Sequence, residues 1–200
     1  MKKLLSIATL LGVMSGAASA APYVMPSSQP GALTPYDIQP VYSVEGLYGI
    51  ANKSDDPDTY GARLSFSLYS DATETFRHQF NLNIAGLWGS ETLRDEYGSY
   101  DMDVFMMPIT AGYNINIELC DDVMFYLGGK IGYAFCEEES DGHSADGDGL
   151  TFSVGAGFKF QCSDSVYTHV GYEFGRTYMG GDIDYNYGQH TIVVGVGCQF

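Results

Sequence analysis

The last thirteen residues, Gly188-Gln-His-Thr-Ile-Val-Val-Gly-Val-Gly-Cys-Gln-Phe200, alternate between two kinds of side chain. One set of alternate positions is apolar: Ile192, Val194, Val196, Cys198 and Phe200. The positions between them are mostly small or polar: Thr191, Val193, Gly195, Gly197 and Gln199. Successive side chains of a β-strand point to opposite faces, so this segment is predicted to be a strand with one apolar face. Glycine-rich alternation of this kind is typical of a transmembrane β-barrel, whose outward face meets lipid and whose inward face is polar or small.

Seven further alternating stretches precede this strand, giving eight predicted strands at about 41–50, 61–69, 76–88, 104–119, 123–135, 149–161, 166–176 and 188–200. Most approach the roughly 9–11 residues that a tilted transmembrane strand needs. The links after the second, fourth and sixth strands are short: 70–75, 120–122 and 162–165. The links after the first, third, fifth and seventh are longer: 51–60, 89–103, 136–148 and 177–187. Short turns at one end and long loops at the other are expected of an outer-membrane barrel, with both termini on the periplasmic side.

The chemistry of the two faces favours a membrane barrel over a soluble one. In the stretch 149–161, large apolar groups such as Phe152 and Phe158 share one face, while Lys159 shares the other face with glycines. A soluble barrel would place large apolar groups inward and charges outward. The predicted fold class is therefore all-β, an eight-stranded antiparallel up-and-down transmembrane β-barrel spanning residues 41–200.

The first twenty residues are predicted to be a secretory signal peptide. Lys2 and Lys3 form its basic start, an apolar stretch follows, and Ala18-Ser-Ala20 is a small-residue cleavage site. A membrane anchor is disfavoured because the apolar stretch is too short to span a bilayer. Residues 21–40 carry five prolines and no periodicity, so they are predicted to be an extended segment.

Cleavage would leave a strongly acidic chain, with 7 basic against 25 acidic residues and a formal charge of −18. Nucleic-acid binding depends on neutralising phosphates with Lys and Arg, so nucleic acid is excluded as a partner.

Four segments resemble the small outer-membrane barrels of the OmpA/OmpX type: Met107-Pro-Ile-Thr-Ala-Gly-Tyr-Asn114, Phe125-Tyr-Leu-Gly-Gly-Lys-Ile-Gly-Tyr133, Phe152-Ser-Val-Gly-Ala-Gly-Phe158 and Val194-Gly-Val-Gly-Cys-Gln-Phe200. The resemblance implies outer-membrane lipid and lipopolysaccharide as surroundings. It also implies insertion by the barrel-assembly machinery, with Phe200 as part of the assembly signal. One departure is that OmpA carries a periplasmic peptidoglycan-binding domain after its barrel, whereas this chain stops at the barrel.

A polar network is predicted inside the barrel, formed by Glu45, Arg63, Glu118, Lys130, Lys159, His169 and Glu173. Side chains just fill the interior of an eight-stranded barrel, and buried charges must be paired. An interior closed by paired charges is therefore favoured, and a narrow channel for ions or small solutes is the alternative. Outward aromatic residues near strand ends are predicted to form interfacial girdles: Tyr48, Trp88, Tyr113, Tyr133, Phe160 and Phe200.

No metal or cofactor is predicted. The acidic stretch 137–148 could offer oxygen ligands to calcium, but it lacks the EF-hand spacing, so a solvated acidic loop is favoured. Catalysis is also disfavoured, because a nucleophile needs a general base held within reach. His78, His169 and His190 occur singly on strands, and His143 lies in a Gly/Asp-rich loop. A lipid-modifying barrel enzyme is therefore the least favoured function.

Four cysteines follow the predicted cleavage site: Cys120, Cys136, Cys162 and Cys198. Export places them in an oxidising compartment, where disulfides are permitted. Cys136 is predicted at the outer rim, about 25 Å from the other three, which exceeds the roughly 7 Å between Cα atoms that a disulfide allows. Any bridge should therefore join cysteines of the periplasmic rim. Alternate strands there are about 10 Å apart, so four free thiols remain an open alternative.

These observations predict an outer-membrane protein of a Gram-negative-type bacterium. Its expected role is structural or surface-interacting, without catalysis, through four long acidic extracellular loops. The sequence does not identify the partner of those loops.

Overall fold

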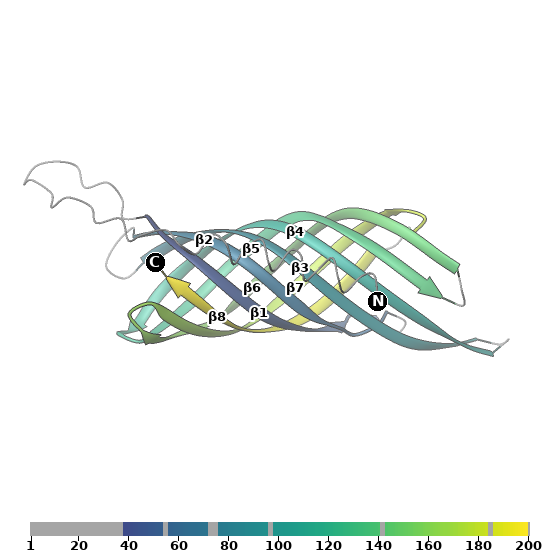
Figure 1. Cartoon of the computed structure of the whole chain (residues 1–200), viewed down its shortest axis with the longest axis horizontal. Coiled ribbons are helices and arrows are strands. Elements are labelled where there is room, and N and C mark those ends of the chain that lie inside the picture. Colours follow the sequence, from purple (N-terminus) through teal and green to yellow (C-terminus); the bar gives the residue numbers. More distant parts are fainter. Residues whose placement is uncertain are drawn as a thin grey trace, which may run out of the picture. The chain divides into compact units, whose positions relative to one another are not determined.

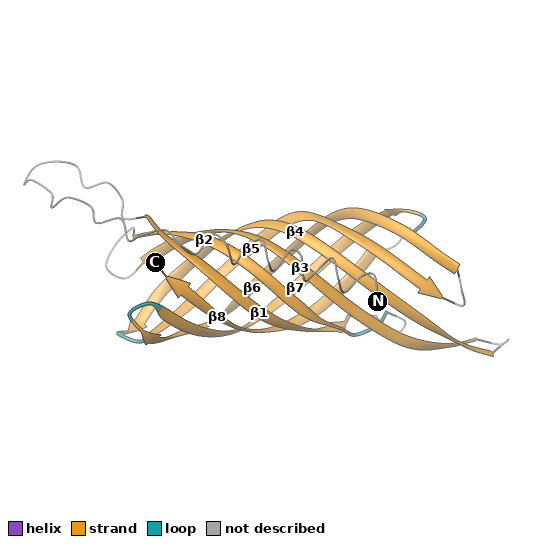
Figure 2. Cartoon of the chain, viewed as in Figure 1, coloured by secondary structure: helices purple, strands orange, loops and turns teal. Residues whose placement is uncertain are grey.

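The computed structural model describes residues 38–53, 56–71, 76–95, 98–140, 143–183 and 186–199. Eight strands follow one another along the chain: β1 (Ile38–Ala51), β2 (Thr59–Asp71), β3 (Phe76–Asp95), β4 (Gly98–Cys120), β5 (Val123–Ser140), β6 (His143–Ser163), β7 (Val166–Gly181) and β8 (Asn186–Gln199). Figures 1 and 2 show them as long, strongly tilted ribbons. Among the described residues, no helix is long and apolar enough to cross a membrane.

The strands form one closed barrel in chain order, and every neighbouring pair is antiparallel. The barrel closes between β1 and β8, where Val41 pairs with Gln199 and Ala51 pairs with Gln189. The predicted fold class is thereby confirmed. The beginning of β1 and the end of β8 lie at the same end of the barrel, which also carries the turns Asp121–Asp122 and Asp164–Ser165. We call this end the turn rim.

The alternation predicted from the sequence is present in the strands. On β8, Thr191, Val193 and Gly195 are buried, whereas Ile192 and Val194 are exposed on the outer surface. The same inward and outward sets occur on β1, β2 and β3, where the buried positions include serines, asparagines and a glutamine. The result is a polar interior surrounded by an apolar outer band.

Inward glycines make room for the larger polar side chains of the interior. A Cβ atom on Gly171 would lie 1.9 Å from the Tyr126 hydroxyl, and one on Gly195 would lie 2.5 Å from the His169 ring and 2.7 Å from Glu45 Cγ. Real Cβ atoms essentially never approach other heavy atoms this closely. The glycine face of β7 and β8 therefore has a steric cause, because the lumen holds large side chains that come from other strands.

Three of the four predicted long loops are corrected, because the strands there run further than the sequence predicts. The first predicted loop, 51–60, does connect two strands, since β1 ends at Ala51 and β2 begins at Thr59. The segments 89–103 and 136–148 were predicted as loops, but most of each continues as paired strand in β3–β4 and β5–β6. The segment 177–187 likewise belongs largely to β7 and β8. These stretches lie beyond the apolar outer band. Their outward side chains are therefore no longer consistently apolar, although the backbone hydrogen bonds between the strands continue. We call this opposite end of the barrel the hairpin rim.

The predicted signal peptide (1–20) lies outside the described residues, as does most of the proline-rich segment (21–40). Residues 38–40 of that segment already belong to β1. Both assignments remain predictions.

Candidate functional site: the closed interior and the hairpin rim

A buried charge cluster crosses the middle of the lumen. Arg63 on β2 donates from Nη1 and Nη2 to the two carboxylate oxygens of Glu173 on β7, at 2.9 and 2.8 Å. Its Nε also contacts Glu45 on β1, and Lys130 on β5 contacts Glu173. The hydroxyl of Ser43 donates to Glu45 at 3.2 Å. Two cations therefore face two carboxylates, so the cluster is electrically balanced.

Lys159 on β6 lies in a separate cage of neutral groups nearer the turn rim. Its ammonium donates to Gln79 Oε1 at 2.6 Å, to Asn116 Oδ1 at 2.5 Å and to the Tyr69 hydroxyl. These three acceptors match the three N–H donors of the ammonium group. The rings of Tyr69, Tyr126 and Tyr167 surround it, with centroids 4.9, 5.2 and 5.7 Å from Nζ. Contact between a cation and aromatic rings stabilises a buried ammonium that has no carboxylate beside it.

His169 on β7 connects the cage to the charge cluster. Its ring packs against Tyr126 and Tyr167, with centroids 6.5 and 5.8 Å apart. Its Nε2 lies 3.4 Å from a carboxylate oxygen of Glu45. The imidazole therefore fills the space between the two groups.

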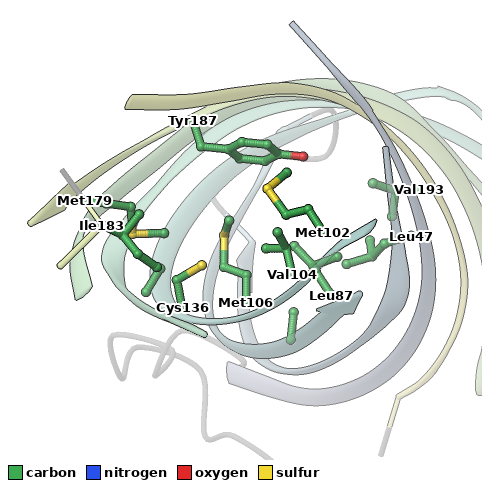
Figure 3. Close-up of a cluster of buried hydrophobic side chains, with 12 residues drawn as sticks. Leu47, Leu87, Met102, Val104, Met106, Cys136, Met179, Ile183, Tyr187 and Val193 are labelled. Atoms are coloured by element: carbon green, nitrogen blue, oxygen red, sulfur yellow. The ribbon is translucent and has the colours of Figure 1, made fainter. Parts of the chain in front are cut away.

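An apolar layer fills the lumen on the other side of the charge cluster, toward the hairpin rim. Its described members are buried side chains from six strands and from the segment after β7: Leu47, Ala85, Leu87, Met102, Val104, Met106, Ala134, Cys136, Met179, Ile183, Tyr187 and Val193. Figure 3 shows Met102, Met106 and Cys136 pointing into the barrel among the others. The Tyr187 hydroxyl donates to the Pro57 carbonyl oxygen at 2.8 Å. Sequence reasoning missed this layer.

A signal for the layer is nevertheless present in Asp101-Met-Asp-Val104, where acidic and apolar residues alternate at the outer end of β4. Met102 and Val104 are buried, while Asp101 and Asp103 are exposed. The chemistry of the two faces is inverted there relative to the rest of the strand. Such a wall resembles that of a soluble barrel, which indicates that this part of β4 lies beyond the apolar band.

The cage, the charge cluster and the apolar layer follow one another along the lumen and leave small cavities between them. One cavity of about 40 Å³ lies beside Lys159, His169 and Glu45, and another of about 70 Å³ lies between Arg63 and Met106. Cavities of this size hold a few water molecules. The interior side chains therefore occupy most of the lumen and leave room for only a few water molecules.

Six of the seven predicted interior residues lie in these layers: Glu45, Arg63, Lys130, Lys159, His169 and Glu173. Glu118 is the exception and is corrected here. It lies near the end of β4, beside a register shift between Glu118 and Cys120, and pairs with Arg77 at 3.8 Å. Both side chains of this pair are about one-third exposed (34% and 31%). Glu118 shares the inward face, but it belongs to the turn rim and not to the central network.

The predicted girdle residues are placed as follows. Tyr48, Tyr113, Tyr133 and Phe160 are exposed on the outer face. Trp88 is half-buried and packs against Phe105, with ring centroids 5.3 Å apart. Phe200 lies outside the described residues, so its role as an assembly signal remains a prediction, as does the girdle itself.

All four cysteines lie in the described part of the chain, and none forms a disulfide there. Cys136 is buried in the apolar layer, whereas Cys120 and Cys162 are exposed near the turn rim. Among the described residues, no group of three or more His, Cys, Asp or Glu side chains is arranged to hold a metal ion.

Two hairpins project from the hairpin rim (Figure 1). The ladder between β2 and β3 ends at Thr59 and Gly89, but the ladder between β3 and β4 continues to Asp95 and Gly98. The pairing of β4 with β5 ends at Met102. Beyond these points the β3–β4 hairpin has no strand ladder on either outer edge in the described structure. Its outer part is acidic, and Thr92 donates to Asp101 at 2.7 Å across the two strands.

The β5–β6 hairpin runs beyond one neighbour, β7, because pairing of β6 with β7 ends at Gly147 and Gly181. Its other strand, β5, stays paired with β4 up to Ser140. Glu138 faces inward near its base. Partial burial raises the pKa of the Glu138 carboxyl, and the charge of Asp56 raises it further.

Comparison with known proteins agrees with this architecture. Residues 6–200 match the family model described as the outer membrane protein beta-barrel domain. Among solved structures, the neisserial surface protein A is similar, with a TM-score of 0.56 and 12% identity over 82% of this chain and 97% of that one. The attachment invasion locus protein Ail of Yersinia pestis is similar at a TM-score of 0.51 and 15% identity, with the same coverage. No curated protein matches the sequence significantly.

Proposed function

The chain belongs to the outer membrane protein beta-barrel domain family, and from that premise we propose that it is a non-enzymatic surface-interaction protein. In this proposal the turn rim and both termini face the periplasm, and the hairpin rim faces the exterior. The outer apolar band then contacts outer-membrane lipid, and lipopolysaccharide surrounds the outer part of the wall.

The observation that carries the proposal is the projecting β3–β4 hairpin. From Ser90 to Asp95, β3 has backbone groups on the side away from β4 that no neighbouring strand pairs with in the described structure. Such an edge can accept an additional strand, with main-chain hydrogen bonds supplying affinity and alternate side chains supplying specificity. The proposed partner is therefore an extended segment of another protein, and the acidic side chains of the hairpin favour a basic segment.

The closed interior favours a surface-interaction protein over a channel. A layer of apolar side chains and a balanced charge cluster occupy the lumen on which conduction would depend. The structure is thus suited to act as a rigid support that holds the hairpins away from the membrane surface.

Trimming each hairpin separately tests the proposal. In one variant a two-residue turn joins Gly89 to Val104, which are cross-strand partners, and removes the projecting part of β3–β4. A matched variant trims β5–β6 by joining Cys136 to Gly147, which are also partners. Both should keep barrel folding, seen as heat-modifiable gel mobility. Loss of cell or matrix binding in the first variant alone supports the proposal, and unchanged binding in that variant would refute it.

A further inference from the structure

An apolar groove opens on the outer face of the barrel where β4, β5, β6 and β7 approach the hairpin rim. It encloses about 430 Å³. One row of cross-strand partners runs through it from Met107 to Phe135, Asp148 and Gly180. The next row toward the rim contains Phe105, Glu137 and Asp146. Gly180 carries no side chain, and this leaves the groove open on the β7 side.

The groove lies at the boundary between two kinds of outer surface. The row immediately below it, toward the turn rim, consists of Ile109, Tyr133, Leu150 and Tyr178, all of which are exposed apolar or aromatic side chains. Toward the hairpin rim, the outward positions Glu137, Glu139 and Asp146 are acidic. An occupant would therefore meet apolar surface at one end and carboxylates at the other.

The charges that line the groove favour a cationic occupant. Glu137, Asp146 and Asp148 line it, and its lining among the described residues includes no basic side chain. The Tyr133 hydroxyl is hydrogen-bonded to Asp148, which places that carboxylate beside the apolar row. Carboxylates next to a low-dielectric region attract a cation more strongly than they would in bulk water, and they repel anions. Phosphate-bearing lipids are disfavoured for the same reason.

We propose that this groove binds a small cationic amphiphile, an amine that carries an alkyl or aryl chain. The chain would lie along Phe105, Met107 and Phe135, and the ammonium would lie beside Asp146 and Asp148. This site is independent of the projecting β3–β4 edge, so either proposal can fail without the other.

The fluorescence of Trp88 can report binding in the groove. It is the one tryptophan of the chain, and it is the cross-strand partner of Phe105 in the upper row of the groove. A bromine-labelled dodecylamine bound in the groove should quench Trp88 fluorescence in a saturable way. Dodecanol with the same label has the same chain without the charge. A surface ion pair contributes at most about 1 kcal/mol, which is a factor of about five in affinity. The amine should therefore bind the full-length protein in nonionic micelles up to about fivefold more tightly than the alcohol for an ammonium that contacts one carboxylate.

Two variants and one control locate the binding. Asp146→Asn with Asp148→Asn should reduce amine binding to the level of the alcohol, whereas Asp121→Asn with Asp122→Asn, the same charge change at the turn rim, should leave it unchanged. Gly180→Leu should fill the groove and abolish saturable quenching by both probes. This substitution is sterically tolerable, because a Cβ on Gly180 meets nothing closer than 3.8 Å.

Folding of each variant is checked by heat-modifiable gel mobility. Equal, non-saturable quenching by amine and alcohol would show contact with micelle-dissolved probe only and would overturn the proposal. Unchanged saturable quenching in Gly180→Leu would overturn it as well.

Discussion

At Arg63, one guanidinium contacts two carboxylates, Glu45 and Glu173, in the middle of the barrel, and Lys130 supplies the second positive charge. Removing one partner of a buried ion pair leaves an uncompensated buried charge, which costs about 3–5 kcal/mol. We therefore expect Arg63→Met to lower the free energy of unfolding by about that amount, measured by urea unfolding in lipid vesicles with Trp88 fluorescence. Arg77→Met removes a partly exposed pair and should cost less than about 1 kcal/mol. Equal losses in the two variants would contradict the central role of Arg63.

The inward glycines give a second prediction at the residue scale. Gly195→Ala would place a Cβ against His169 and Glu45, whereas Gly46→Ala on the outer face meets nothing closer than 3.8 Å. Overpacking of a filled interior typically costs about 1–3 kcal/mol. Urea unfolding should show that loss for Gly195→Ala and a much smaller change for Gly46→Ala. A stable Gly195→Ala variant would mean that the interior side chains rearrange freely.

At the scale of elements, protonation of Glu138 is expected to make the stability of the β5–β6 hairpin depend on pH. Its pKa in the folded protein is raised above the ordinary value of 4.5. The protonated form is therefore favoured by folding, so the stabilisation is complete below about pH 4.5 and is lost as the pH rises through the raised value. Amide hydrogens of the hairpin should exchange more slowly at pH 4 than at pH 7, after correction for intrinsic exchange rates. Glu138→Gln should remove this difference, and Glu139→Gln at the exposed neighbouring position should retain it.

The strands also show what sequence periodicity can reveal. Alternation identified all eight strands and their inward faces because lipid and a polar lumen impose opposite chemistry on the two faces of each strand. It failed for 136–148, where the strands have left the apolar band and the outward positions are acidic. It also missed the apolar layer, because Leu47, Leu87 and Met106 lie on inward faces whose other members are polar. Pairing of Glu118 with Arg77 depends on strand ends and register shifts, which periodicity does not report.

For the whole molecule, the order of layers along the barrel axis determines whether anything can pass. Near the turn rim, Lys159 and three tyrosines close the lumen; next comes the charge cluster; and the apolar layer closes the part below the hairpin rim. A hydrated ion would have to displace a balanced set of buried ion pairs and then enter an apolar region, which is costly for any charge. The arrangement predicts a barrel without steady conductance.

Planar-bilayer recording of the purified protein tests this prediction. We expect no stable, reproducible conductance step for the unaltered protein. Lys130→Ala should also remain silent, because the apolar layer stays in place when the charge cluster is weakened. Combining Met102→Ala and Met106→Ala with Lys130→Ala removes side chains from both layers and should produce measurable current, provided that gel mobility shows a folded barrel. Steady conductance in the unaltered protein that changes with Lys130 or Glu173 would instead favour a narrow channel, and the hairpin rim would then surround its outer mouth.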